Sequence, residues 1–409
     1  MKFKKIFFTY VKSFSVASIL LILIFFSIYI NGCESRERVI KIGNQCALSG
    51  EYKSFGEEQT LSIELAISKL SPVRIGGFDY DIKIITKDDE GNPEKAFLVA
   101  QEMVDSGVSA VIGSTFDGTT ESSLTVYKEY GIPLVSPFAQ KTEVNDTRDI
   151  FFRMIISNKQ KIENIAKFIG EKIKPCKLIL INNREEYSIN LTDYLKEVLL
   201  SEYGIETVST MSLDIDKKDA GIILDMGEED MGVIIDNLII EGPDTIFICS
   251  SYEEIAAIMA ASREAGLQSR FITETLGMDD NIFNLTEASN LEGLIAVIPD
   301  PPSIARYSQD SKAVNFWHEF NNYLAQVDYP DISIKGPGQY SPYCYDSVFI
   351  IIEAMKRANS ILPGDYVDEL KAISYDGITG RIEFDDKGNR LNPESTIFIV
   401  KDGAWIRYQ

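Results

Sequence analysis

The stretch VSAVIG at residues 108–113 runs directly into STFDGTT at residues 114–120, and these two segments decide the fold. A second stretch, GIPLVSP at residues 131–137, runs in the same way into FAQ at 138–140. Neither apolar run alternates with polar residues, which is typical of strands buried on both faces of a parallel sheet. The residues between them have apolar positions at helical spacing, so the sequence predicts a βαβ unit. Small and hydroxyl-bearing residues follow both strands, at the edge where open α/β sheets bind small molecules.

The alternation of strands and helices continues on both sides of this unit. The expected strands and helices are listed here in chain order: strand 39–47, helix 58–70, strand 80–86, helix 93–106, helix 159–173, strand 177–181, helix 189–203, strand 245–249, helix 253–265, strand 271–273, helix 311–326, helix 343–359 and a hairpin from 380–385 to 397–400. This order predicts an α/β protein with two Rossmann-like lobes, each built on a parallel central sheet. Pro299, Pro301 and Pro302 mark a crossing between the lobes.

The N-terminus has the pattern of a secretory signal. Four lysines precede an uncharged run from Ser13 to Ile30, and INGC at residues 30–33 resembles a bacterial lipobox, in which Cys33 is acylated. Residues 1–32 are therefore expected to be a lipoprotein signal peptide. The alternative is an uncleaved signal anchor, since 18 uncharged residues could span a thinned bilayer. Both interpretations place the remaining chain outside the cytoplasm. With Cys33 acylated, the protein is expected to be lipid-anchored to the cell membrane, in the periplasm or at the cell surface.

Charge and cysteine content narrow the class of partner. The net charge is −22, and losing the four lysines of the signal leaves −26 on 377 residues. Such a balance excludes a nucleic-acid partner, whose phosphates require stripes of Lys and Arg. Four cysteines follow Cys33 without any CxxC pair, so buried free thiols are expected, although an oxidising compartment permits one or two disulfides.

The chain resembles the branched-chain amino-acid (Leu/Ile/Val) solute-binding family of ABC transporters, which are type I periplasmic binding proteins. The motifs that carry the resemblance are IG at 42–43, LSG at 48–50, FG at 55–56, DD at 88–89, PEKA at 93–96, VIG at 111–113, IPLVSP at 132–137, YDSV at 345–348 and GITGRIEFD at 377–385. The resemblance implies two lobes joined by a three-strand hinge, residues 39–154 with 298–375 and residues 155–297 with 376–409. It also implies a monomer that closes on a small-molecule ligand and delivers it to an ABC permease.

The resemblance also implies ligand-binding positions. They are Phe55, Asp117, Gly118, Thr119, Ala139, Gln140, Tyr187, Ser251, Tyr252 and Glu274. The loop after Gly113 would hold the ligand's carboxylate, the loop after Pro137 would hold its ammonium and carboxylate, and Glu274 would bind its ammonium. Two of these residues depart from the family pattern, because Asp117 replaces a serine and Gln140 replaces a threonine.

Asp117 is the more consequential departure. A ligand carboxylate about 4 Å away would be repelled by about 4 kcal/mol at an effective dielectric constant near 20, which is nearly three decades of affinity. Asp117 is therefore expected either to cap the helix that begins at Gly118 or to meet a cationic group of the ligand. We expect a ligand that retains an amine, bound by Glu274, Asp117 or both, while carboxylate recognition is weakened or moved.

No pattern for catalysis, metal or cofactor binding stands out. His318 is the sole histidine and lies off the apolar stripe of its helix, so a Ser-His-Asp or Cys-His enzyme lacks a base. No cofactor and no metal are expected; an enzyme would have to be a hydrolase that uses carboxylates such as Asp117 and Glu274. The prediction is a solute-binding lipoprotein of an ABC importer. The alternative is a ligand-sensing lipoprotein that acts on a membrane signalling partner.

Overall fold

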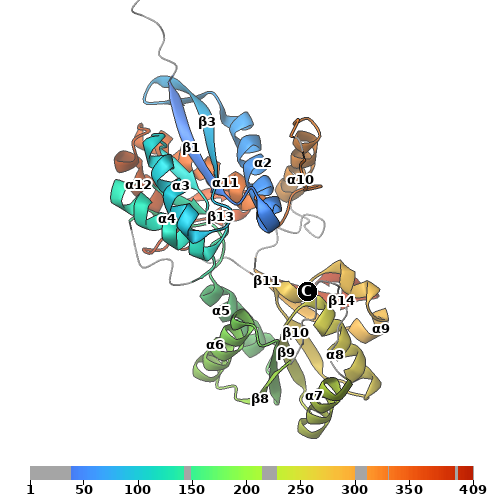
Figure 1. The fold of residues 1–409 in the computed structure, drawn as a ribbon. Coiled ribbons are helices and arrows are strands. Elements are labelled where there is room, and N and C mark those ends of the chain that lie inside the picture. Colours follow the sequence, from blue (N-terminus) through green and yellow to red (C-terminus); the bar gives the residue numbers. More distant parts are fainter. Residues whose placement is uncertain are drawn as a thin grey trace, which may run out of the picture.

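The chain forms two α/β lobes, and more than one segment of the chain connects them (Figure 1). A computed structural model describes residues 38–141, 149–213, 228–299, 311–329, 331–391 and 395–408. The expected signal peptide and the acylation site at Cys33 lie outside these residues, as does the crossing expected at Pro301 and Pro302. Within the described residues, no helix is long and apolar enough to cross a membrane.

The first lobe is built on a six-stranded sheet in the order β2-β3-β1-β4-β5-β6. The strands from β3 to β6 are parallel, and β2 is an antiparallel edge strand. Its elements are β1 (Val39–Cys46), η1 (Gly50–Tyr52), α2 (Lys53–Leu70), β2 (Val73–Ile75), β3 (Phe78–Asp88), α3 (Pro93–Asp105), β4 (Ala110–Ile112), α4 (Asp117–Tyr130), β5 (Leu134–Ser136), β6 (Phe151–Arg153), α10 (Ser311–Leu324), α11 (Ser341–Ala358), α12 (Pro363–Lys371), β12 (Tyr375–Gly377) and β13 (Gly380–Ile382).

The second lobe is built on a seven-stranded sheet in the order β15-β14-β11-β10-β9-β7-β8. Strands β11, β10, β9, β7 and β8 are parallel to one another. β14 pairs antiparallel with β11, and β15 pairs antiparallel with β14. Its elements are α5 (Asn158–Phe168), η3 (Ile169–Ile173), β7 (Leu178–Asn182), α6 (Glu186–Tyr203), β8 (Thr207–Ser212), α7 (Glu228–Glu241), β9 (Thr245–Cys249), α8 (Tyr252–Glu264), β10 (Arg270–Thr273), η4 (Thr275–Gly277), η5 (Asp280–Asn284), α9 (Ala288–Leu291), β11 (Ile295–Pro299), β14 (Ser395–Lys401) and β15 (Ala404–Arg407).

The βαβ unit predicted from the sequence is present, and its boundaries have clear local causes. β4 and β5 are fully buried, and the helix α4 between them ends at Gly131, whose φ of 64° suits a residue without a side chain. Gly113 at the end of β4 has a φ of 146°, and a Cβ there would overlap the Gln45 carbonyl oxygen of β1. Only glycine permits the two strand ends to come so close.

Two predicted details of the C-terminal region are wrong. The segment at 380–385 does not pair with 397–400: β13 pairs with β12, and β14 pairs with β11 and β15. Ile382 and Phe384 also pack into the core of the first lobe, where Phe384 contacts Phe152 with ring centroids 5.3 Å apart. Residues 376–384, which we expected in the second lobe, therefore pack with the first, because their apolar side chains complete its core.

Two of the segments that connect the lobes lie side by side. We call this region, residues 153–157 and 388–391, the waist. The Arg153 N–H donates to the Gly388 carbonyl oxygen at 2.8 Å, and the Arg153 Nε donates to Asn389 Oδ1 at 3.1 Å. Arg390 donates from Nη1 to the Met154 carbonyl oxygen at 3.1 Å. Both arginines are nearly inaccessible to solvent. These contacts couple the segment leaving β6 to the segment that returns toward β14.

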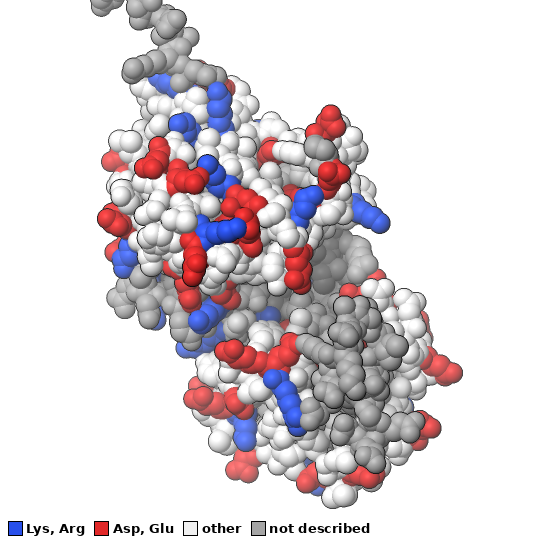
Figure 2. All heavy atoms as spheres, viewed as in Figure 1, with Lys and Arg blue, Asp and Glu red and all other residues white. Residues whose placement is uncertain are grey.

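The surface agrees with a solvated acidic protein. Figure 2 shows acidic and basic side chains interspersed over one face, without a basic stripe. Cys46, Cys249 and Cys344 are buried free thiols, as predicted, whereas Cys176 is a free thiol at the surface.

Candidate functional site

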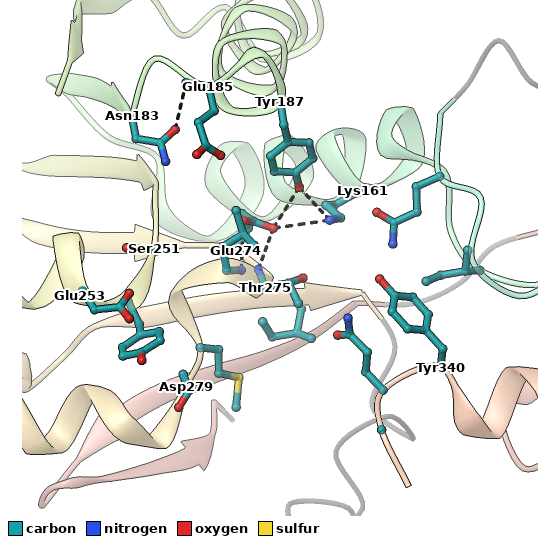
Figure 3. Close-up of a pocket in the computed structure, with 18 of the residues that line it drawn as sticks. Lys161, Asn183, Glu185, Tyr187, Ser251, Glu253, Glu274, Thr275, Asp279 and Tyr340 are labelled. Atoms are coloured by element: carbon teal, nitrogen blue, oxygen red, sulfur yellow. Dashed lines mark hydrogen bonds and ion pairs between the residues drawn. The ribbon is translucent and has the colours of Figure 1, made fainter. Parts of the chain in front are cut away.

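A cavity of about 1140 Å³ lies between the two lobes. The residues from the second lobe and the waist that line it are Ile155, Lys161, Asn183, Glu185, Tyr187, Ser251, Tyr252, Glu253, Glu254, Glu274, Thr275, Leu276, Met278, Asp279 and Ile298. The residues from the first lobe that line it are Gln140, Trp317, Pro337, Gly338, Gln339, Tyr340 and Tyr343. The labelled side chains converge on this space from both lobes (Figure 3).

A buried ion pair forms one wall of the cavity. Lys161 Nζ lies 3.5 Å from Glu274 Oε2, and the two side chains are 6% and 0% exposed. Lys161 also donates to the Tyr187 hydroxyl oxygen at 2.9 Å, and that hydroxyl donates to Glu274 Oε2 at 3.2 Å (Figure 3). Burial and the adjacent Glu274 carboxylate hold the pKa of Tyr187 well above its ordinary value, so the phenol stays protonated.

Three elements bring these groups together. Glu274 directly follows β10, and its carboxylate accepts from the N–H groups of Thr275 at 2.8 Å and Leu276 at 3.1 Å. Lys161 lies in the first turn of α5, which begins with a capping box between Ser157 and Gln160. Tyr187 lies in the first turn of α6. The Glu274 carboxylate thus accepts from Lys161, the Tyr187 hydroxyl and two backbone N–H groups, and the Cys249 thiol lies 4.0 Å from its Oε1.

The loop between β9 and α8 forms the next part of the wall. Ser251 is the N-cap of α8, and its side chain accepts from the Glu254 N–H. Glu254 is buried and accepts from the Ser250 hydroxyl and the Ser251 N–H. A hydrogen bond with Glu253 is the main cause that raises the pKa of Tyr252 to about 12, and the negative charge of Asp279 adds to this shift.

The hydroxyl side chains of the loop after β4 form hydrogen bonds within the first lobe. The Ser114 hydroxyl donates to Asp89 Oδ2 at 3.0 Å, and Thr115 Oγ1 accepts from the Ala47 N–H at 3.0 Å. The Thr119 hydroxyl accepts from the Phe116 N–H at 3.1 Å, at the start of α4. All three hydroxyls thus bond to backbone or buried polar groups of the protein, including that of Thr119, which is one of the expected ligand-binding positions.

Asp117 joins the two loops that follow β4 and β5. Its Oδ1 accepts from the N–H groups of Gln140 at 2.8 Å and Lys141 at 3.0 Å. The helix begins at Asp117 rather than at Gly118, with Phe116 as the N-cap, so the expected capping role of Asp117 is wrong. Asp117 lines a smaller neighbouring cavity of about 730 Å³ together with Tyr187, and does not line the larger one.

The loop after β5 is also held by the protein. The Ala139 carbonyl oxygen accepts from Arg153 Nη1, and the Lys141 carbonyl oxygen accepts from Arg153 Nη2 at 2.7 Å. The Gln140 carbonyl oxygen accepts from the Asn158 N–H at 2.8 Å. Gln140 is the residue of this loop that lines the larger cavity.

Phe55 packs in an aromatic cluster beside the cavity rather than in its lining. Its ring centroid lies 6.2 Å from Tyr340, 6.3 Å from Phe116 and 6.5 Å from Phe138. Tyr340 is the member of this cluster that lines the cavity, 4.6 Å from Phe138 between ring centroids.

The structure therefore brings together half of the expected positions. Gln140, Tyr187, Ser251, Tyr252 and Glu274 line the cavity, whereas Phe55, Asp117, Gly118, Thr119 and Ala139 do not. Sequence reasoning missed Lys161, Trp317, Tyr340 and the acidic residues Glu185, Glu253 and Asp279. A signal for Lys161 was present: it precedes Ile165 and Phe168 at helical spacing, so a lysine occupies the buried face of α5.

Glu58 on α2 lies beside this site and has an unusual charge environment. Its carboxylate packs so closely on Gly338 that a Cβ at that position would overlap its oxygens. Burial raises the pKa of the Glu58 carboxyl to about 7 from 4.5. Because the folded state holds this proton more tightly than the unfolded chain, Glu58 costs stability progressively as the pH rises from 4.5 to 7.

We expect Glu58→Gln to stabilise the protein by about 2–3 kcal/mol at pH 8 and by under about 1 kcal/mol at pH 5, measured by urea unfolding. The amide carries no charge at either pH and so removes the cost of burying one. Glu51→Gln, at an exposed position of η1, is the control and should change little at either pH. An equal effect of Glu58→Gln at both pH values would contradict this account.

Comparison with known proteins adds to this geometry. The sequence pattern described as "Periplasmic binding protein" matches residues 39–404. The chain belongs to the periplasmic binding protein family. A leucine-, isoleucine-, valine-, threonine- and alanine-binding protein of Pseudomonas aeruginosa is 23% identical over 363 residues, which cover 88% of this chain and 89% of that protein.

Solved structures share the two-lobed fold of this periplasmic binding protein. A branched-chain amino-acid transporter substrate-binding protein of Streptococcus pneumoniae, solved with isoleucine, matches with a TM-score of 0.64 and 20% identity, covering 91% of this chain and 99% of that one. A solute-binding protein of an ABC transporter from R. palustris, solved with benzoate, matches with a TM-score of 0.64 and 16% identity, covering 90% and 95%. The same fold thus accommodates an amino acid in one protein and an aromatic acid in another.

Proposed function

We propose that this protein is the extracytoplasmic solute-binding component of an ABC importer. It captures a small amino acid or related polar solute between its lobes and delivers it to a membrane permease. The observation that carries the proposal is the large cavity whose polar and aromatic lining comes from both lobes, with Lys161, Tyr187 and Glu274 on one side and Gln140 and Tyr340 on the other. The names of the curated relatives support the same role.

The mechanism follows from the division of the lining between two lobes. A solute that contacts both walls binds the closed arrangement better than the open one, and so shifts the population toward closure. Acylation at Cys33 would keep the protein at the membrane, close to its permease. Two lobes that separate and close around the waist then exchange solute with the permease without a chemical step.

Native mass spectrometry of the full-length chain, purified from membranes in mild detergent, tests this function. A small solute should copurify and rebind after removal, and titration calorimetry should give a one-to-one stoichiometry. We expect Tyr252→Ala in the second lobe and Tyr340→Ala in the first each to weaken binding by about ten- to hundredfold, since both remove aromatic contacts in the cavity. Tyr130→Phe, on an exposed face of α4, is the control. Binding that responds to one lobe alone would contradict capture between the lobes.

A further inference from the structure

The ammonium group of Lys161 occupies the place in which the ammonium of a solute was expected. Its Nζ lies 3.5 Å from Oε2 of Glu274, the carboxylate expected to bind that ammonium, and the two side chains are 6% and 0% exposed. Lys161 reaches this carboxylate from α5, whereas Glu274 directly follows β10. The protein therefore supplies the cation for Glu274 from its own chain.

The Glu274 carboxylate has no room for a second cation. Besides Lys161, its Oε2 accepts from the Tyr187 hydroxyl at 3.2 Å and from the Thr275 N–H at 2.8 Å, and its Oε1 accepts from the Leu276 N–H at 3.1 Å. These contacts take up the roughly four lone-pair positions of a carboxylate. The ammonium of a solute could reach Glu274 only by displacing Lys161, and beside Lys161 it would meet a like charge.

Lys161 itself still has a hydrogen to donate. A lysine ammonium carries three hydrogens and no acceptor. Lys161 donates to the Tyr187 hydroxyl oxygen at 2.9 Å and to Glu274 Oε2 at 3.5 Å (Figure 3). Among the described residues, no group accepts its third hydrogen, although Lys161 is buried and lines the cavity. A buried donor without an acceptor costs free energy, and an acceptor on a bound solute removes that cost.

Thr275 adds a second polar group of the same kind. Its hydroxyl oxygen is buried and has no hydrogen-bond partner among the described residues. Thr275 lines the cavity and follows Glu274 directly, so it belongs to the same wall as Lys161 (Figure 3). A hydroxyl can donate as well as accept. This wall therefore offers donors to a solute, whereas its one carboxylate is already occupied.

We propose that the solute carries no ammonium group and presents an acceptor oxygen, of a carbonyl or carboxyl group, to Lys161. The third hydrogen of Lys161 is donated to that oxygen, while Glu274 and Tyr187 hold the lysine in place. This inference rests on the proposed function and narrows its cargo to polar solutes without an amine. The apolar part of the solute packs on Leu276 and Met278, which line the same cavity.

Four compounds with one carbon skeleton and different polar groups test the cargo. The compounds 4-methylpentanamide and 4-methylpentanoate offer an acceptor oxygen without an amine, whereas leucine and 4-methylpentan-1-amine carry an ammonium. We expect titration calorimetry of the full-length chain to give at least tenfold tighter binding for the better of the first two than for either of the others. The amide and the acid distinguish a neutral acceptor from a charged one. Any solute that copurifies should lack an ammonium group.

Lys161→Met should reverse this preference. The variant removes the donor and leaves Glu274 without a cation, so we expect binding of 4-methylpentan-1-amine to tighten at least tenfold and binding of the preferred acceptor compound, or of the copurified solute, to weaken about tenfold. Lys161→Met with Glu274→Gln lacks both charges and should gain no amine binding. Lys167→Met removes the same charge from the exposed last turn of α5 and is the matched control. Circular dichroism verifies that each variant is folded.

The outcomes separate the cargo from the transport role. Binding of leucine or the amine as tight as that of the better acceptor compound, or a copurified solute with an ammonium, would overturn the cargo proposal while leaving solute capture intact. Unchanged amine binding in folded Lys161→Met would overturn it as well, and if that variant does not fold, the unmodified chain decides. A chain that binds none of the four compounds and retains no solute from cells would overturn both proposals.

Discussion

Lys161→Met is expected to lower the free energy of unfolding by about 3–4 kcal/mol, because it leaves the Glu274 carboxylate without its cation in a buried site. Methionine has nearly the length of lysine and no charge, so the change removes the ammonium and leaves little empty volume. The Tyr187 hydroxyl and two N–H groups keep bonding Glu274, which keeps the loss below that of a fully isolated charge. Urea unfolding at pH 7 measures the effect.

A double variant separates two contributions to this loss: the missing attraction between Lys161 and Glu274, and the cost of leaving the Glu274 charge buried without a cation. Lys161→Met with Glu274→Gln should recover most of the stability, to within about 1–2 kcal/mol of the unmodified chain, because no uncompensated charge remains. Lys159→Met, on the exposed face of the same helix and 3.9 Å from Glu163, should cost less than about 0.5 kcal/mol. If Lys161→Met were as mild as Lys159→Met, the pair would not be the buried contact described above.

Asp117→Ala is expected to cost about 2–3 kcal/mol of stability and to weaken solute binding. The substitution strands the N–H groups of Gln140 and Lys141, which donate to Asp117 Oδ1. Because Gln140 lines the cavity, a loosened loop also displaces part of the first-lobe wall. Thermal unfolding and titration calorimetry give the two effects separately.

Asp117→Asn is the informative partner of this variant. An amide oxygen can still accept from the same two N–H groups, so we expect less than half of the alanine effect on both stability and binding. If the Asp117 charge contacted a cationic solute, the asparagine variant would bind as weakly as the alanine variant while remaining stable. That result would restore the ligand-contact role that the sequence left open for Asp117.

The fold was predictable because its deciding signals are local. Each of these signals acts within a few residues. They include uninterrupted apolar runs such as 108–113, the helix N-cap at Asn92-Pro93 and the helix C-cap at Gly131. The C-terminal strands were mispaired because the local pattern does not determine which strands pair. β14 pairs with β11, nearly 100 residues away, and Ile382 of β13 packs into the core of the other lobe. Pairing over such distances depends on the assembled sheet.

The site was half predictable for a related reason. The residue types at the strand ends predicted a polar binding site there. A hydroxyl, however, can bond to a ligand or to the protein itself. Ser114 bonds to Asp89, and Thr119 bonds to the Phe116 backbone. Lys161 stood out as a lysine on a buried helix face, but its partner Glu274 lies 113 residues later. Only the folded chain reveals that the carboxylate expected to meet a ligand is already neutralised.

Closure of the lobes on a solute is the central claim, and a distance between them tests it most directly. Dyes attached through non-canonical amino acids at Ser289 of α9 and His318 of α10, exposed positions in different lobes on the same side of the molecule (Figure 1), report this distance by energy transfer. Addition of the copurified solute should raise transfer efficiency to a saturating value in the unmodified chain. Tyr252→Ala should require more solute to reach it. An efficiency that stays constant while calorimetry shows the solute bound would contradict capture between two closing lobes.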